Sequence, residues 1–208
     1  MNVKVGILKR FIIYMAILTF VMFTVWAFVK SFMNRPPGDY ETEVCDIRLK
    51  DKEYGKALEA ADDALNKTPN HRGAMMCKAL VYISQKKYIE ADLVLSKLII
   101  FLEKNVEDDD KTGIGTLAAA YANRGIIKDR NKNYEGALQD YVKALGIDHE
   151  AVAGPGLGTI ILNYKFKSSS VKERALYLNE QLQLPEEERV LSIKELDEGQ
   201  VMHKPGKL

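Results

Sequence analysis

The chain has 208 residues, of which 47% are hydrophobic, and its 30 Lys and Arg residues nearly balance its 29 Asp and Glu residues. This near-neutral charge provides no overall basic field, so we expect no nucleic-acid partner. The length leaves room for one domain of about 100–200 residues and an additional segment.

The two cysteines, Cys45 and Cys77, have neither metal-ligand spacing nor a surrounding cluster of cysteine and histidine. A zinc site is therefore not expected. Two free, packed thiols are favoured, and one disulfide is the alternative.

The first predicted element is a run of nineteen residues without a charge, from Phe11 to Val29. As a helix it would extend ~28 Å, close to the ~30 Å hydrocarbon core of a bilayer. A cleaved signal peptide would have a shorter apolar core and a small-residue cleavage site. A buried core helix would need apolar partners that the rest of the chain lacks. We therefore predict a cytoplasmic N-terminus at residues 1–10 and a transmembrane anchor in the lipid bilayer at residues 11–32.

The charges beside this anchor favour one orientation. Two lysines and an arginine precede it, whereas Lys30 and Arg35 are soon followed by acidic residues. Positive flanks tend to remain in the cytoplasm. The modest bias therefore predicts a bacterial inner-membrane protein with a cytoplasmic N-terminus and a periplasmic main domain. Residues 33–37 contain two prolines and form a predicted stiff spacer.

A recurring Tyr-x-x-Ala pattern organises the rest of the chain. It starts at Tyr54, Tyr88 and Tyr134, with separations of 34 and 46 residues. A 34-residue period is typical of a helix-turn-helix unit that buries its apolar face only by stacking on its neighbours. Apolar residues at helical spacing predict helices at 53–65, 74–84, 88–99, 120–125 and 134–145, and the apolar residues 100–102 can extend the third of these. Pro69 ends the first of these, and Asn70 is a candidate cap for the second.

These units resemble tetratricopeptide repeats. That family has a small residue where facing helices cross, an aromatic residue before the second helix, an early alanine and a late apolar pair. The matching residues are Cys45, Ala79 and Gly125 at the crossing, Tyr54, Tyr88 and Tyr134 before the second helix, Ala57, Ala91 and Ala137 early in it, and Ala64-Leu65, Leu98-Ile99 and Ala144-Leu145 late in it. Only the first unit keeps the family's terminal proline.

The resemblance implies an all-α fold in which the anchor precedes a short helical solenoid at residues 38–184. The units are three repeats and a degenerate fourth, at about 38–71, 72–105, 118–151 and 156–185, and a tail follows at 185–208. Twelve extra residues within 104–117 separate the second and third units, and the acidic, Gly-containing middle of this segment predicts a loop. In the fourth unit, helices are predicted at 156–166 and 171–182, with a short helix from Glu186.

No motif predicts catalysis. The Gly-rich run at 154–158 lacks the strand and the Lys-Ser/Thr pair of a phosphate-binding loop. The acidic run at 107–110 lacks the alternating ligands of a calcium loop. His71, His149 and His203 are far apart in the sequence, and the first two are at junctions between repeats, where surface positions are expected. We therefore expect a non-enzymatic protein with no catalytic residue, no cofactor and no metal site.

The resemblance further implies that the first helices of successive units line a concave groove, which would bind a partner protein. The predicted groove residues are Thr42, Glu43 and Asp46 of the first unit, Met76, Cys77, Leu80 and Ile83 of the second, and Asn123, Ile126 and Arg130 of the third. The alternative for Leu80 and Ile83 is packing against a neighbouring helix. The Lys and Asn residues with which some family members clamp a terminal carboxylate are not reproduced, which argues against a heat-shock co-chaperone.

We predict a membrane-anchored scaffold that serves as an assembly or accessory factor for a membrane or periplasmic complex. The alternative is a targeting or import receptor that faces the cytoplasm, which requires the opposite orientation. A concealed enzyme is a third, weaker reading.

Overall fold

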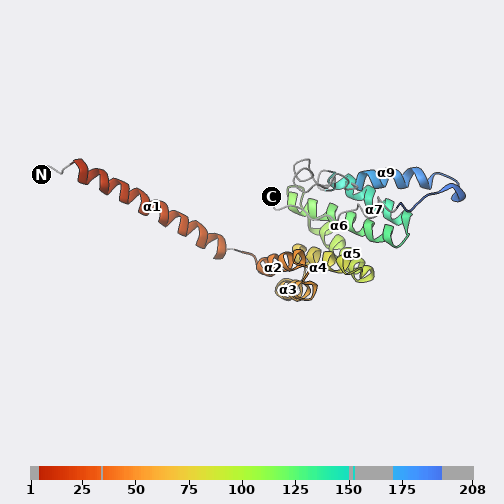
Figure 1. The fold of residues 1–208 in the computed structure, drawn as a ribbon, viewed down its shortest axis with the longest axis horizontal. Coiled ribbons are helices and arrows are strands. Elements are labelled where there is room, and N and C mark those ends of the chain that lie inside the picture. Colours follow the sequence, from red (N-terminus) through yellow and green to blue (C-terminus); the bar gives the residue numbers. More distant parts are fainter. Residues whose placement is uncertain (1–4, 34, 150–151, 153–170, 194–208) are drawn as a thin grey trace. The chain divides into compact units, whose positions relative to one another are not determined.

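A computed structural model describes residues 5–33, 35–149, 152 and 171–193 of the chain. These residues contain helices and no strand, which confirms the all-α prediction (Figure 1). The chain divides into two compact units, Met1–Pro37 and Gly38–Leu208, which are described separately below.

The first unit contains the helix α1 (Val5–Met33), which is longer than the predicted anchor. Within it, Gly6–Lys30 has a mean hydropathy of 2.3 and is long and apolar enough to cross a membrane, although a signal sequence would have the same properties. Its large side chains are exposed, up to 75% for Phe28. The hydroxyl groups of Thr19 and Thr24 donate to carbonyls one turn earlier, at 2.8 Å. Both hydroxyls therefore have partners within the helix, as a bilayer would require.

The second unit consists of helical hairpins. Its helices are α2 (Asp39–Lys50), α3 (Tyr54–Lys67), α4 (Arg72–Ser84), α5 (Tyr88–Asn105), α6 (Lys111–Arg130), α7 (Tyr134–Ile147) and α9 (Val171–Leu182), followed by the 3₁₀ helix η1 (Glu186–Glu188). The three hairpins α2–α3, α4–α5 and α6–α7 are the three predicted repeats, so the fold is of the tetratricopeptide type.

The turns inside the three hairpins are nearly identical. Lys52, Lys86 and Lys132 are in the left-handed region, with φ of 60°, 60° and 63°. In each turn the lysine N–H donates to the carbonyl three residues earlier, and the next N–H donates to the carbonyl five residues earlier. This pair of hydrogen bonds is the Schellman motif, which usually has glycine at the left-handed position. The sequence patterns above did not include this repeated lysine.

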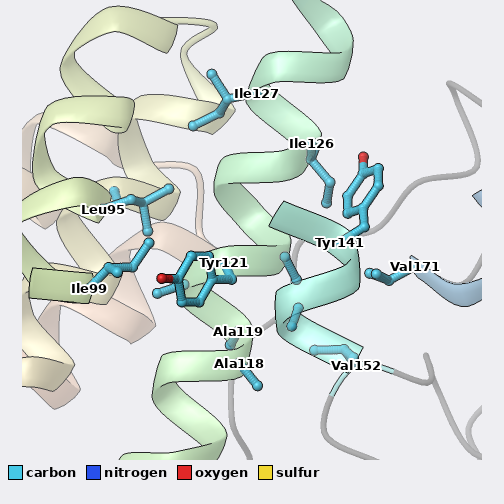
Figure 2. Close-up of a cluster of buried hydrophobic side chains, with 14 of the residues drawn as sticks. Leu95, Ile99, Ala118, Ala119, Tyr121, Ile126, Ile127, Tyr141, Val152 and Val171 are labelled. Atoms are coloured by element: carbon cyan, nitrogen blue, oxygen red, sulfur yellow. The ribbon is translucent and has the colours of Figure 1, made fainter. Parts of the chain in front are cut away.

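Close packing between the paired helices depends on the small residue at the crossing. A Cβ atom on Gly125 of α6 would lie 2.6 Å from the ring of Tyr141 on α7. Tyr141 is fully buried, and Figure 2 shows its ring beside Ile126. Ala57, Ala91 and Ala137, the early alanines of the repeats, are also fully buried. The predicted crossing and core positions are therefore confirmed.

Three local predictions need correction. The acidic residues 107–110 do connect two helices, as predicted, but the loop is shorter than expected, because α6 begins at Lys111 and includes Gly113 and Gly115. The cap of α4 is not Asn70 but His71, whose Nδ1 accepts from the Ala74 N–H at 3.2 Å. The side chain of His71 is only 12% exposed, so its predicted surface position is also wrong.

In the fourth unit, the second predicted helix is present as α9, with the expected bounds of Val171 and Leu182. The first predicted helix, at 156–166, lies outside the described residues. The same applies to the Gly-rich run at 154–158, to His203 and to the tail from residue 194.

The prediction of two free thiols is wrong, because Cys45 of α2 and Cys77 of α4 form a disulfide. Their Cα atoms are 6.4 Å apart, within the reach of such a bond. Both residues are fully buried in a small alanine-rich cluster with Ala57, Ala61 and Val81. The positions of the cysteines within the repeats could have predicted this disulfide. Both cysteines are near the middle of the first helices of consecutive units, and these helices stack on each other.

Candidate protein-binding site

The ten residues predicted to line a concave groove fall into two groups. Six are buried in the structure, with at most 4% of their surface exposed: Met76, Cys77, Leu80, Ile83, Asn123 and Ile126. The other four, Thr42, Glu43, Asp46 and Arg130, are half-buried or exposed. The two groups therefore differ in their access to a partner.

The buried group belongs to the main hydrophobic cluster rather than to a surface. Met76, Leu80 and Ile83 of α4 share this cluster with Ile126 of α6. The side-chain amide of Asn123 donates to the sulfur of Met76 at 3.6 Å. These contacts join α4 directly to α6, so in this structure the middle of the predicted groove is packed. The alternative given for Leu80 and Ile83, packing against a neighbouring helix, agrees with this arrangement.

The accessible group lies at the two ends of the repeat array, on α2 and at the end of α6. The Thr42 hydroxyl donates to the Gly38 carbonyl at 2.8 Å, so it is held against the start of α2. The guanidinium of Arg130 lies over the ring of Tyr88, 5.9 Å from its centroid, and remains exposed. Binding of a partner at these four residues remains a prediction.

Ionic contacts fix the third hairpin. The Arg124 guanidinium donates two hydrogen bonds to the Asp140 carboxylate, each 2.8 Å, and Lys128 pairs with the same carboxylate at 2.8 Å. Hydrogen bonding to Asp140 raises the pKa of Arg124. On the same face, burial and a hydrogen bond to Glu103 raise the pKa of Tyr121 to about 12. Arg124 therefore stays positively charged and Tyr121 stays neutral at neutral pH, which suits a structural role.

A second ionic contact attaches α9 to this hairpin. The buried Arg174 guanidinium donates to both carboxylate oxygens of Asp129 on α6, each at 2.7 Å. It also donates to the Leu191 carbonyl at 2.9 Å, and the Tyr141 hydroxyl donates to Asp129 at 3.2 Å. Because removal of one partner of such a pair leaves an uncompensated buried charge, Arg174 strongly favours the docked position of α9.

The acidic segment after α5 is tied to the second hairpin. Asp110 caps α6 by accepting from the Gly113 N–H at 2.8 Å and pairs with Arg72 at the start of α4. The Arg72 guanidinium, and then the Gly113 N–H, hold the pKa of Asp110 below its usual range. Among the described residues, no group of three or more His, Cys, Asp or Glu side chains is arranged to hold a metal ion.

An accessible apolar groove of about 310 Å³ lies between α7 and α9. Leu138, Val142 and Leu145 form its α7 wall, spaced one and two helical turns apart. Lys172, Ala175, Leu176 and Asn179 form the α9 wall, and His149 completes one end. Val142 and Leu176 are 57% and 54% exposed. We call this feature the α7–α9 groove.

The sequence patterns above did not include this groove. The repeat positions account for Ala137, Tyr141 and Ala144, which face the core. Leu138 and Leu145 lie beside them and are partly buried against the main cluster, and Leu145 also belongs to the late apolar pair of the repeat pattern. Val142 is apolar yet exposed, and this residue was the available signal.

Comparisons with known proteins add little beyond the fold. No family model and no curated protein matches the sequence. Among solved structures, the chain is similar to the Arabidopsis OM64 TPR domain, with 18% sequence identity and a TM-score of 0.47. The similarity covers 55% of this chain and 84% of that one. A similarity of this size does not bear on function.

Proposed function

We propose that the protein is a non-enzymatic scaffold that is anchored in a membrane by α1 and binds a partner protein through its helical repeats. The observation that carries this proposal is the order of two features along the chain: an exposed apolar helix of membrane-spanning length, Gly6–Lys30, directly precedes a stacked array of helical hairpins. Stacked hairpins present extended surfaces that suit protein partners.

The disulfide between Cys45 and Cys77 supports a location of the repeats outside the cytoplasm. Disulfides form and persist mainly in oxidising compartments, such as the bacterial periplasm. The modest excess of positive charge before α1 favours the same orientation. For a bacterial source, the repeats would then be periplasmic, and the partner would belong to a membrane or periplasmic complex.

The test of this topology compares two reporters fused to the C-terminus, alkaline phosphatase, which is active only outside the cytoplasm, and a fluorescent protein that matures only inside it. We expect phosphatase activity alone. Fluorescence alone would refute the proposed orientation and favour a receptor that faces the cytoplasm.

The test of protein binding uses a photo-crosslinking amino acid at Glu43 or at Arg130 in the full chain within its native membrane. The control position is Glu59, an exposed residue of α3 outside the predicted groove. We expect one discrete protein adduct from position 43 or 130, identified by mass spectrometry and recovered again when the partner is used as the bait. The absence of any adduct from every position on the repeats would refute protein binding.

A further inference from the structure

We propose that the α7–α9 groove is a docking site for a short amphipathic helix of the partner protein, with an acidic residue at one end of that helix. This inference rests on the proposed protein-binding function and assigns it to a surface that does not include any of the ten predicted groove residues. Three properties of the groove support it: its exposure, its charge and its helical walls.

The exposure of the groove is unusual for a packed repeat. Val142 of α7 and Leu176 of α9 line it and each leaves more than half of its surface accessible, while the lining residue Ala175 is 5% exposed. The groove therefore has a packed floor and apolar rims. Covering such rims with apolar side chains removes them from water, which drives association.

The charge of the groove selects the partner. Among the described residues that line it, Lys172 and His149 are ionisable and none is a carboxylate. Neither Lys172 nor His149 forms an ion pair within the described part of the chain. An acidic side chain or terminal carboxylate of the occupant would complement Lys172, and a basic one would be disfavoured there.

The walls of the groove favour a helix over an extended peptide. Both walls are α-helices, whose backbone N–H and C=O groups are already paired within each helix. An extended peptide would therefore find no backbone partners in these two walls, and Asn179 is the one side-chain amide among the lining residues that the structure describes. A helix satisfies its own backbone groups and presents only side chains. The stripe from Leu138 to Leu145 spans ~10 Å, which matches about two turns of such a helix.

The test measures binding of synthetic peptides to the full chain in lipid nanodiscs, because free detergent would compete for an apolar groove. The probe is a fluorescein-labelled, helix-favouring peptide of about 14 residues, with leucines at positions i, i+4 and i+7 and glutamates at one end. A second peptide has lysines in place of the glutamates. Fluorescence anisotropy should show saturable binding, with the glutamate peptide binding about two- to fivefold more tightly.

Matched variants locate the binding site. Leu176→Glu should weaken binding of the glutamate peptide about tenfold or more. The control Ile100→Glu changes a residue of α5 with the same exposure, 55% against 54%, and should leave binding unchanged. Lys172→Glu should reverse the preference between the two peptides. The side chains of Leu176 and Ile100 are both exposed, so the variants Leu176→Glu and Ile100→Glu should fold normally, and circular dichroism checks this.

Several outcomes would overturn the inference: no saturable binding of either peptide, equal effects of Leu176→Glu and Ile100→Glu, or an unchanged preference in Lys172→Glu. Binding of laurate in place of the peptides would assign the groove to a lipid instead.

Crosslinking distinguishes a failure of this docking site from a failure of the proposed function. If the native partner crosslinks from Arg130 but not from Val142, protein binding stands and this docking site is wrong. If no position on the repeats captures a partner, the proposed protein-binding function itself is wrong.

Discussion

Loss of the buried disulfide should remove a large part of the stability of the repeat domain. The bond joins residues separated by 32 positions, and the chain-entropy relation for a loop of this length gives about 3.7 kcal/mol at 25 °C. In the variant Cys45→Ala/Cys77→Ala, two fully buried sulfur atoms are also lost, which adds roughly 1 kcal/mol. Because a domain is typically stable by only about 5–15 kcal/mol, this loss should be easily measured.

The assay is urea-induced unfolding of the full chain, followed by far-ultraviolet circular dichroism with and without reductant. Reductant should lower the free energy of unfolding of the unchanged protein by about 3–4 kcal/mol and leave the double variant unaffected. The double variant thus controls for effects of the reductant elsewhere. In the native protein without reductant, an alkylating reagent should label neither cysteine. Equal unfolding free energies of the oxidised and reduced protein, or labelling of both cysteines, would refute the reasoning.

Four further predictions concern other contacts. Gly125→Ala should destabilise the protein by about 1–2 kcal/mol, because its methyl group meets a buried ring at 2.6 Å, whereas Gly146→Ala, with nothing within 4 Å, should be neutral or stabilise it by up to about 1 kcal/mol. Lys86→Gly should raise the free energy of unfolding by about 0.5–1 kcal/mol, since glycine adopts the φ of 60° without strain; a loss of stability would contradict this. Arg174→Ala should cost about 3–5 kcal/mol and speed amide exchange in α9, and normal protection there would count against the docking role of the ion pair. Asp110→Asn should cost roughly 1 kcal/mol or less at pH 7. The lowered pKa stabilises the folded state only while the carboxylate is ionised, so the difference in urea midpoint should disappear as the pH falls through the pKa of the folded state, and a difference that persists at pH ~2 would contradict it.

The fold was largely predictable because its determinants are local and repeat along the chain. The Tyr-x-x-Ala pattern identified the second helix of each hairpin, and the small residue at the crossing identified how closely the two helices approach, as Gly125 and Tyr141 illustrate. The helical part of the 104–117 segment was missed because glycines and acidic residues weaken the local helix signal. There, an N-cap by Asp110 and packing of the buried Gly113 and Gly115 support the first turns of α6.

The candidate site was less predictable because exposure depends on contacts between repeats. Leu80 and Ile126 have the expected positions on their helices, yet both are buried, since α4 and α6 are joined through Met76 and Asn123. Conversely, the exposure of Val142 reflects the position of α9, which no periodicity within α7 reports. A repeat pattern therefore predicts which residues share a face, but not whether another helix covers that face.

A disulfide and a buried ion pair secure the two ends of the repeat array. A linear array ordinarily frays from its terminal units, since each has a neighbour on one side only. Here the first hairpin is linked covalently to the second through Cys45 and Cys77, and α9 is held to the third hairpin by Arg174 and Asp129. If α1 holds the chain in a membrane, a pull on the bound partner would be transmitted through α2 into α4 by a covalent bond, and the first hairpin could not peel away alone. The first two hairpins would therefore yield under force together rather than one at a time.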